Sequence, residues 1–305
     1  MRFPTGLGIR TLWGLLPVLI GVASAAESGF DSRVAWRHVE RLVGFGPRPS
    51  GSAALARARA YLVAELKKNG LTVREQAFTA TTPDGPIGMV NVIGELPGRR
   101  PQVILLGGHY DTKHFKAFRF VGAHDGGSGT GVLLELARSL ARASGEFTYW
   151  IVFFDGEEAR RDWTRRDGIY GSRHMVEALR REGSLGLVRA VVVVDMIGDR
   201  DLTLRREGRS TPWLTEVMWG SARRLGHRAH FLNETLAVED DHTPFLRAGV
   251  PATLLIDFDY PYWHTPDDTL DKLSLRSLGI LGEVLLDGLR ALEVWLARGD
   301  GAGEK

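Results

Sequence analysis

A set of histidine and carboxylate residues along this 305-residue chain predicts a metal site built without sulfur. The candidate ligands are His109, Asp125, Glu158, Asp195 and His264. The chain has no cysteine, which excludes disulfides, thiolate zinc sites and a cysteine nucleophile. Catalytic zinc accepts histidine nitrogen and carboxylate oxygen, and it keeps one position open for water or substrate. We therefore expect a catalytic zinc ion held by His, Asp and Glu.

Glu157 stands next to Glu158 in a segment that should be a loop or a strand end, so the two side chains diverge. One of them can hold the metal while the other faces the reacting atoms as an acid or base. Taken singly, each motif also fits a simpler structural role. The glutamate pair fits a solvated loop, His109 a polar strand end, Asp195 a helix cap and His264 a packed core histidine. Their joint placement favours the site.

Short apolar segments predict the strands that must position these residues. Four such segments run into polar clusters: 103–106 into His109 and Asp111, 149–154 into Asp155 to Glu158, 188–194 into Asp195, and 253–256 into Asp257 and later His264. Buried apolar strands that alternate with helices indicate a mostly parallel sheet covered on both faces. We predict an α/β fold, a three-layer sandwich with a mostly parallel twisted central sheet. Open sheets of this kind bind ligands beyond the carboxyl ends of their strands, so the four clusters should converge on one crevice.

The remaining patterns complete this expectation. Apolar residues at helical spacing predict helices over 31–43, 53–68, 131–140 and 275–296, the last as one long helix or two shorter ones. Two further strands are expected over 71–78 and 89–96. The glycine-rich run 126–131 lacks the lysine of a phosphate loop, and Ser128 does not fit a nucleophile elbow. The run instead suits a tight turn around a ligand at Asp125 that begins a helix.

Composition and charge set the broad class of the protein. With 44% hydrophobic and 25% charged residues, the chain is an ordinary globular protein rather than a disordered or fibrous one. Its 39 basic and 37 acidic residues are too balanced to favour a nucleic-acid partner. Four arginines between 160 and 166 are interrupted by an acid and are typical of a solvated loop. No repeat or linker divides the chain, so we expect one catalytic domain over 27–305, acting as a monomer.

The N-terminus is typical of an export signal. Arg2 and Arg10 accompany an apolar run over 12–22, and Ala-Ser-Ala at 23–25 fits the small-residue rule for cleavage. The run is shorter than the roughly 20 residues that a membrane-spanning helix needs. We predict a signal peptide over 1–26 and an exported protein, periplasmic or secreted, with an uncleaved membrane anchor as the alternative.

Three separated blocks resemble the glutaminyl cyclases (glutaminyl-peptide cyclotransferases) of the zinc aminopeptidase-like group. The blocks are 153–174, in which Trp163 lies in an insertion after the glutamate pair, 240–251 and 263–265. The resemblance covers nearly the whole chain from residue 30 to residue 296. It implies zinc-dependent cyclisation of the N-terminal glutamine of peptides or proteins to pyroglutamate, with release of ammonia.

The resemblance also implies a ligand set. In zinc aminopeptidases of this group, residues that match all five candidate ligands hold two zinc ions. In animal-type glutaminyl cyclases one zinc ion is held by the matches of Asp125, Glu158 and His264. All five ligand types are present in this chain, so a second ion through His109 and Asp195 stays open.

Other roles follow from the same resemblance. Glu157 is expected to move the proton as general base, while Asp195 and Asp240 hold and polarise its path. The residues expected at the substrate pocket are Trp163, Trp263 and Glu239. Departures from the animal cyclases include Glu239, which stands where they often have glutamine, and Leu254, which stands where they often have a pocket histidine.

Two alternatives differ from the cyclase in what they do to a peptide. A di-zinc aminopeptidase would activate a metal-bound water and cleave the first peptide bond. A non-catalytic binding domain would keep the fold without turnover. The intact acids Glu157, Asp195 and Asp240 disfavour the binding domain, since such modules tend to lose their catalytic acids.

Overall fold

The structure, a computed structural model, describes residues 29–142 and 145–301 together with Met1. Beyond Met1, the signal peptide predicted over 1–26 therefore lies outside the described residues. Within the described part of the chain, no helix combines the length and the apolar character needed to cross a membrane.

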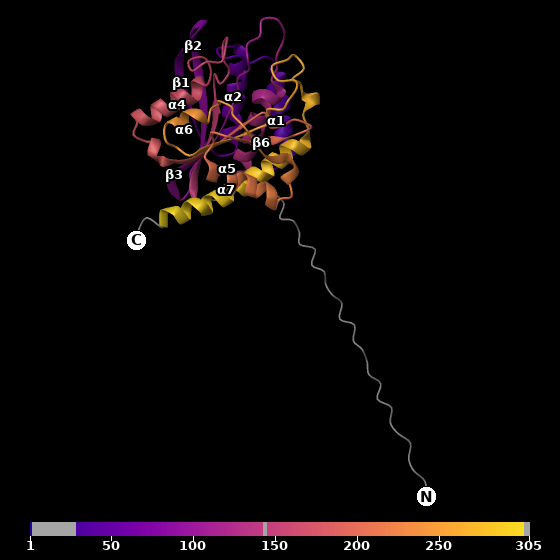
Figure 1. The fold of residues 1–305 in the computed structure, drawn as a ribbon. Coiled ribbons are helices and arrows are strands. Elements are labelled where there is room, and N and C mark those ends of the chain that lie inside the picture. Colours follow the sequence, from indigo (N-terminus) through magenta and orange to yellow (C-terminus); the bar gives the residue numbers. More distant parts are fainter. Residues whose placement is uncertain (2–28, 143–144, 302–305) are drawn as a thin grey trace.

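A six-stranded sheet in the order β1-β2-β4-β3-β5-β8 forms the centre of the molecule (Figure 1). Its strands are β1 Thr72–Thr82, β2 Gly85–Leu96, β3 Arg100–His109, β4 Phe147–Phe154, β5 Val188–Asp195 and β8 Ala252–Ile256. The four strands β4, β3, β5 and β8 are parallel neighbours, as predicted. The other two pairings, β1 with β2 and β2 with β4, are antiparallel. Only two residues join β1 to β2, which is too few for the crossover that a parallel pair requires.

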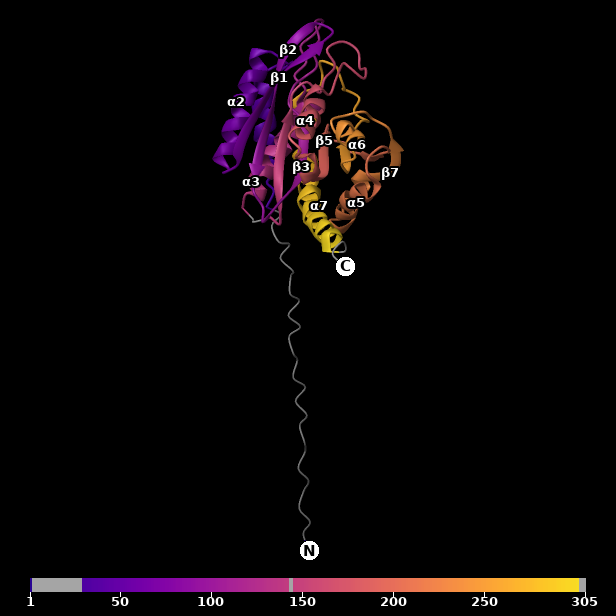
Figure 2. The same ribbon diagram turned by 90° about the vertical axis from the view of Figure 1, so that its left-hand side faces the viewer.

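The sheet is covered on both faces, which confirms the predicted three layers. Successive residues of a strand point to opposite faces, so Leu106 and Val192 pack on one side while Leu105 and Val193 pack on the other. The first side is covered by α1 Ser32–Gly44, α2 Ala53–Lys68, α3 Gly129–Leu140, α5 Pro212–Arg224 and α7 Leu275–Gly301. The second side is covered by α4 Tyr170–Arg181 and α6 Thr243–Arg247, opposite α2 in both views (Figures 1 and 2). A small parallel sheet of β6 Leu204–Glu207 and β7 Phe231–Leu236 lies outside these layers.

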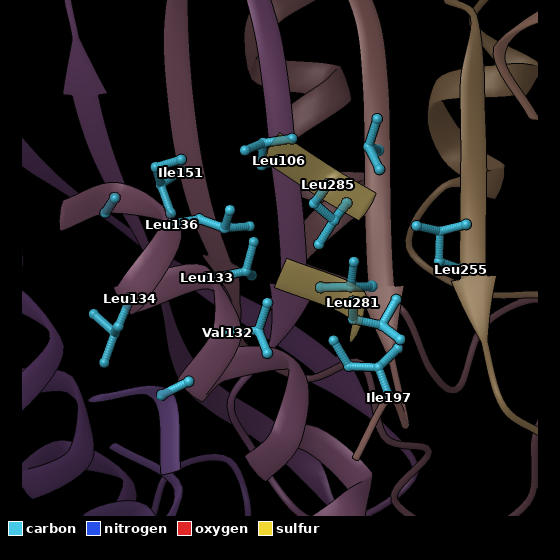
Figure 3. Close-up of a cluster of buried hydrophobic side chains, with 14 of the residues drawn as sticks. Leu106, Val132, Leu133, Leu134, Leu136, Ile151, Ile197, Leu255, Leu281 and Leu285 are labelled. Carbon is cyan, nitrogen blue, oxygen red and sulfur yellow. The ribbon is translucent and has the colours of Figure 1, made fainter. Parts of the chain in front are cut away.

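The largest core cluster lies between the sheet and α3 and α7. Figure 3 shows Leu106, Ile151 and Leu255 of the strands beside Leu133 of α3 and Leu285 of α7. The predicted C-terminal helix is a single element. Because α3 begins directly after the glycine-rich turn, packing of this core fixes the position of the turn that carries Asp125.

Arg48 joins the loops above this core. Its side chain is fully buried, and its guanidinium group donates hydrogen bonds of 2.7 to 3.3 Å to five carbonyl oxygens. The acceptors are Leu42, Gly46, Tyr110, Val121 and Gly122. They belong to the end of α1, the segment after β3 and the segment before Asp125. One side chain therefore holds together three segments that position the polar clusters.

Replacing Arg48→Met should leave these buried carbonyl oxygens without donors and lower the free energy of unfolding by more than about 3 kcal/mol. Urea unfolding of the metal-free protein measures the effect. Arg57→Met is the matched control, because Arg57 is exposed on α2 and its loss should change stability by less than about 0.5 kcal/mol. Equal unfolding midpoints for the two variants would contradict the role given to Arg48.

Candidate active site and metal centre

The carboxyl ends of the parallel strands bring the predicted residues together. His109 ends β3, Glu157 and Glu158 follow β4, Asp195 ends β5, His264 lies in the loop after β8, and Asp125 precedes α3. All of them are buried except His264, whose side chain is 22% exposed. Each of these residues but His109 lines one cavity of about 420 Å³. The sequence clusters thus meet in one crevice.

Asp125, Glu158 and His264 form the first potential metal site. Nε2 of His264 lies 3.3 Å from Oδ2 of Asp125 and 3.2 Å from Oε1 of Glu158. Zinc bonds of about 2.0–2.2 Å place neighbouring tetrahedral ligands about 3.3–3.6 Å apart, close to these spacings. Oδ2 of Asp125 is buried and has no hydrogen bond of normal geometry within the described residues. The donor types and the spacing fit one zinc-sized cation.

His109, Asp125 and Asp195 form a second potential site. Nε2 of His109 lies 3.2 Å from Oδ1 of Asp125 and 3.0 Å from Oδ1 of Asp195. The donor atoms of each trio lie within 4.8 Å of one another. Asp125 belongs to both trios and faces the two histidines through different oxygens. The arrangement can therefore accept one ion or two.

The charges of the first site are strongly perturbed. Burial alone would lower the pKa of His264, but its contacts with Asp125 and Glu158 raise it to about 10. Burial would raise the pKa of Asp125, but the two histidines lower it well below its usual range. Burial, followed by the charge of Asp125, raises the pKa of Glu158. Two buried carboxylates thus compete for one imidazole, and a bound cation would relieve their repulsion.

The ring of His264 is held in place by aromatic neighbours. Trp263 stacks on it with ring centres 4.1 Å apart, and Phe115 and Phe120 contact it edge-on. The backbone of His264 has a φ of 55°, a left-handed conformation that is strained for a residue with a side chain. Strain of this kind persists where the surroundings fix it, as the carboxylates and aromatic rings do here. His264 is packed, as its simpler interpretation required, but its Nε2 faces two carboxylates.

Asp125 is positioned from behind by Asp268 and Gly126. The buried carboxylate of Asp268 accepts hydrogen bonds from the backbone N–H groups of His124 at 2.8 Å and Asp125 at 3.2 Å. Because Asp268 lies four residues after His264, it joins the loops of two candidate ligands. Gly126 has a φ of 74°, and a Cβ there would lie 2.7 Å from the carbonyl oxygen of Asp111. The predicted tight turn at the glycine run is confirmed.

Glu157 belongs to neither trio. Its backbone is fixed on both sides, since its N–H donates to Oδ1 of Asp111 at 3.2 Å and its carbonyl accepts from the N–H of Ile169 at 2.7 Å. Burial raises the pKa of Glu157 well above its ordinary range, opposed by His109 and reinforced by Asp240. A carboxyl group with a raised pKa holds a proton more readily than an ordinary glutamate, as a group that acts as acid and base requires.

The segment before α6 brings Asp240 to the same cavity. Burial, followed by the charge of Asp195, raises the pKa of Asp240 to about 7. The next residues anchor the segment, because Nε2 of buried His242 lies 3.1 Å from Oε2 of buried Glu207. The same carboxylate accepts a hydrogen bond from the N–H of Val238 at 3.3 Å through Oε1. Asp240 therefore sits on a fixed loop.

The predicted pocket residues lie at the mouth of the cavity. Trp163 and Trp263 line it, and they are 41% and 42% exposed. Glu239 lines it as well, but its carboxylate pairs with Arg247 at 2.6 Å. Lys113 was not expected from the sequence: it also lines the cavity, and its backbone N–H donates to Oε1 of Glu158 at 3.1 Å.

Replacing Asp268→Asn should loosen the turn of Asp125 and weaken zinc binding by about 10- to 100-fold, the usual cost of losing a group that orients a ligand. A zinc titration in competition with a chromophoric chelator measures the affinity. Asp267→Asn removes the adjacent, exposed carboxylate and serves as the control. If both variants bind zinc as tightly as the unaltered protein, Asp268 does not position the ligand.

Comparison with known proteins agrees with this geometry. Residues 91–289 match Peptidase family M28. The glutaminyl-peptide cyclotransferase-like protein of Bos taurus is 32% identical over 273 residues, covering 78% of this chain and 70% of the relative. A crystal structure of an Acidobacteriales bacterium glutaminyl cyclase superposes with a TM-score of 0.83 at 38% identity, covering 87% of this chain and 95% of that chain. A leucine aminopeptidase precursor from Bacteroides thetaiotaomicron has a TM-score of 0.78 at 26% identity, covering 85% and 96%. The chain therefore belongs to peptidase family M28, in the branch of the glutaminyl-peptide cyclotransferases.

Proposed function

We propose that this protein cyclises the N-terminal glutamine of peptides or proteins to pyroglutamate and releases ammonia, using one zinc ion. The observation that carries the proposal is the convergence of Asp125, Glu158 and His264, with the unligated acid Glu157 beside them in one cavity. The relatives named as glutaminyl cyclases support the same activity.

The amine and the amide that react belong to the same glutamine residue, so the enzyme has to orient them rather than bring them together. The α-amine nitrogen attacks the γ-amide carbon of the same residue, the bond from that carbon to the amide nitrogen breaks, and ammonia leaves. Both groups are already tethered, so holding them in line supplies much of the rate. A zinc ion at Asp125, Glu158 and His264 would polarise the γ-carbonyl and stabilise the charge that develops on its oxygen.

Glu157 is the residue that moves the proton. Its carboxylate takes a proton from the attacking amine and delivers it to the departing nitrogen. An α-amine has a pKa of about 8, and the raised pKa of Glu157 brings donor and acceptor closer together. Asp240 helps to keep that pKa high, and Asp195 raises the pKa of Asp240 in turn. The two aspartates thereby tune the proton path.

The cavity must also keep water from the amide. Attack by water would hydrolyse the side-chain amide to glutamate instead of closing the ring. Trp163 and Trp263 stand at the mouth, where the bound residue would cover them, and Glu239 completes the substrate contacts.

We also propose zinc as the resident metal, a single catalytic domain over 27–305 and export of a monomeric enzyme to the periplasm or the exterior. Nitrogen and oxygen donors in both trios, and the zinc-dependent exopeptidase among similar structures, support zinc. The basic start, apolar run and small residues of the N-terminal sequence support export. Peptides with N-terminal glutamine are the proposed partners, without nucleic acid.

One observation favours a second candidate, a two-zinc aminopeptidase. The trio of His109, Asp125 and Asp195 offers a place for another ion next to the first. Incubating the zinc-loaded protein with a glutamine-initiated peptide separates the candidates. Ammonia with all peptide bonds intact supports the cyclase, free glutamine supports the peptidase, and an unchanged peptide would leave only a binding role. Metal analysis of the same sample gives the number of zinc ions.

Replacing Glu157→Gln should lower kcat by about 10²- to 10⁴-fold, the usual contribution of a positioned acid–base group, while zinc stays bound. Ammonia release and metal analysis on one preparation test both parts. Glu177→Gln, an exposed glutamate of α4, is the control that should retain activity. Turnover that survives in Glu157→Gln would remove Glu157 from the proton path.

A further inference from the structure

A second cavity, of about 450 Å³, adjoins the active-site cavity. It is lined by Arg165, Arg209, Glu239, Thr243, Leu246 and Arg247. Glu239 lines the active-site cavity as well, so the two spaces share a wall. The three arginines come from three separate segments: the loop after β4, the turn after β6 and the end of α6. The fold thus gathers guanidinium groups beside the place where a substrate enters.

The second cavity carries an excess of positive charge. Arg247 pairs with Glu239, with Nη2 and Oε1 2.6 Å apart. Within the described part of the chain, no ion pair is seen for the side chains of Arg165 and Arg209. Arg173 of α4 also lies close enough to feel both Glu239 and Arg247 electrostatically. One carboxylate therefore faces the three lining arginines, while Arg173 nearby also has Glu177 as a neighbouring charge.

Hydrogen bonds hold the backbone of the loop that carries Arg165, although the side chains of 161–166 are exposed. Arg173 donates to the carbonyl oxygens of Arg165 at 2.8 Å, Arg166 at 3.1 Å and Gly168 at 2.8 Å. From within the loop, the buried carboxylate of Asp167 accepts from two further backbone N–H groups at 2.7 and 2.9 Å. A backbone that is already held in place loses little further entropy when the loop binds a partner.

Glu207 fixes the opposite wall. Its carboxylate accepts from the backbone N–H groups of Arg209 at 3.0 Å and Ser210 at 2.7 Å. It also binds His242 and the N–H of Val238, which flank the segment that carries Glu239. One buried carboxylate therefore sets the turn of Arg209 and the wall that the two cavities share.

We propose that this second cavity is a subsite for an acidic side chain that follows the N-terminal glutamine of the substrate. The inference rests on the proposed function. A cavity of about 420 Å³ is of the size that takes a small ligand rather than a whole peptide, so the later residues of the peptide must cross its rim. Extended residues advance about 3.3 Å each, which brings the next few side chains to neighbouring surface. Guanidinium groups bind carboxylates through paired hydrogen bonds, so glutamate or aspartate suits this cavity.

The test compares peptides that differ only in charge. Glutamine-initiated peptides carry one glutamate at the second, third or fourth position, and their partners carry glutamine at the same position. At low salt we expect kcat/KM to favour one glutamate peptide by about three- to tenfold, mainly through KM, because the contact is made before and during reaction. Raising the salt from about 0.02 M to about 0.5 M should shrink this ratio, since it screens exposed charges.

A double substitution, Arg165→Gln with Arg209→Gln, should bring the glutamate-to-glutamine ratio close to one. The ratio compares two peptides on one protein, so a general loss of activity does not imitate the effect. Arg57→Gln removes an exposed arginine of α2, distant from both cavities, and should keep the ratio of the unaltered protein. A ratio of one in the unaltered protein, or a preference that survives the double substitution, would overturn the subsite.

Failure of the proposed function gives a different result. In that case no glutamine-initiated peptide releases ammonia, whatever residue follows. Calorimetric titration of the zinc-loaded Glu157→Gln variant with the same peptides then tests the arginine cavity without turnover. Tighter binding of the glutamate peptide by about threefold or more supports it, and equal Kd values overturn it.

Discussion

The carboxylate of Asp125 lies between two imidazoles, and the rest of the site depends on this shared contact. One oxygen faces His264 and the other faces His109, at 3.3 and 3.2 Å. A buried carboxylate in this position needs positive charge around it, which histidines or a cation can supply. The fold holds Asp125 in this position with a tight left-handed turn at Gly126, two N–H groups that donate to Asp268, and a core helix that starts immediately afterwards. The position of the Asp125 carboxylate thus depends on the packing of α3 in the hydrophobic core.

The sequence predicted those parts of the fold and site that depend on local pattern. The helix expected over 53–68 coincides with α2, and four apolar segments became the parallel strands whose ends meet at the crevice. These elements could be predicted because the spacing of apolar residues along a segment reflects which of its side chains are buried. The antiparallel pairing of β1 with β2 was not predicted, because the direction of a strand depends on the strand it pairs with and is not visible in either segment alone.

Residues that act through tertiary contacts were not found in the sequence. Asp268 follows a histidine, a threonine, a proline and another aspartate, and nothing in that string shows which carboxylate is buried. Glu207 and His242 lie 35 positions apart, so their pairing is visible only once β6 and the segment before α6 are placed together. The arginines around 160–166 were expected in a solvated loop, and Arg161, Arg165 and Arg166 are exposed, whereas the side chain of Arg160 is largely covered. The sequence could not show that Arg165 meets Arg209 and Arg247.

Asp195 lies between a potential metal site and the acidic pair of Asp240 and Glu157, so it can serve only one of them fully. Bonded to His109, it belongs to a trio that can hold another ion. Left beside Asp240, it keeps negative charge near Asp240 and Glu157, the latter proposed to move the proton. The same side chain cannot be neutralised by a cation and also exert its full charge on its neighbour. A cation bound at the second trio would therefore lower the pKa values of Asp240 and Glu157 as well as raise the number of bound metal ions.

The stacking of Trp263 on His264 makes two adjacent residues one mechanical unit. The indole stands at the entrance, while the imidazole beside it turns inward to two carboxylates. The stacking and the left-handed backbone of His264 together set how the two rings lie relative to each other. A ligand that displaced the indole would therefore also shift the imidazole relative to the two carboxylates, which couples the entrance of the cavity to the potential metal site.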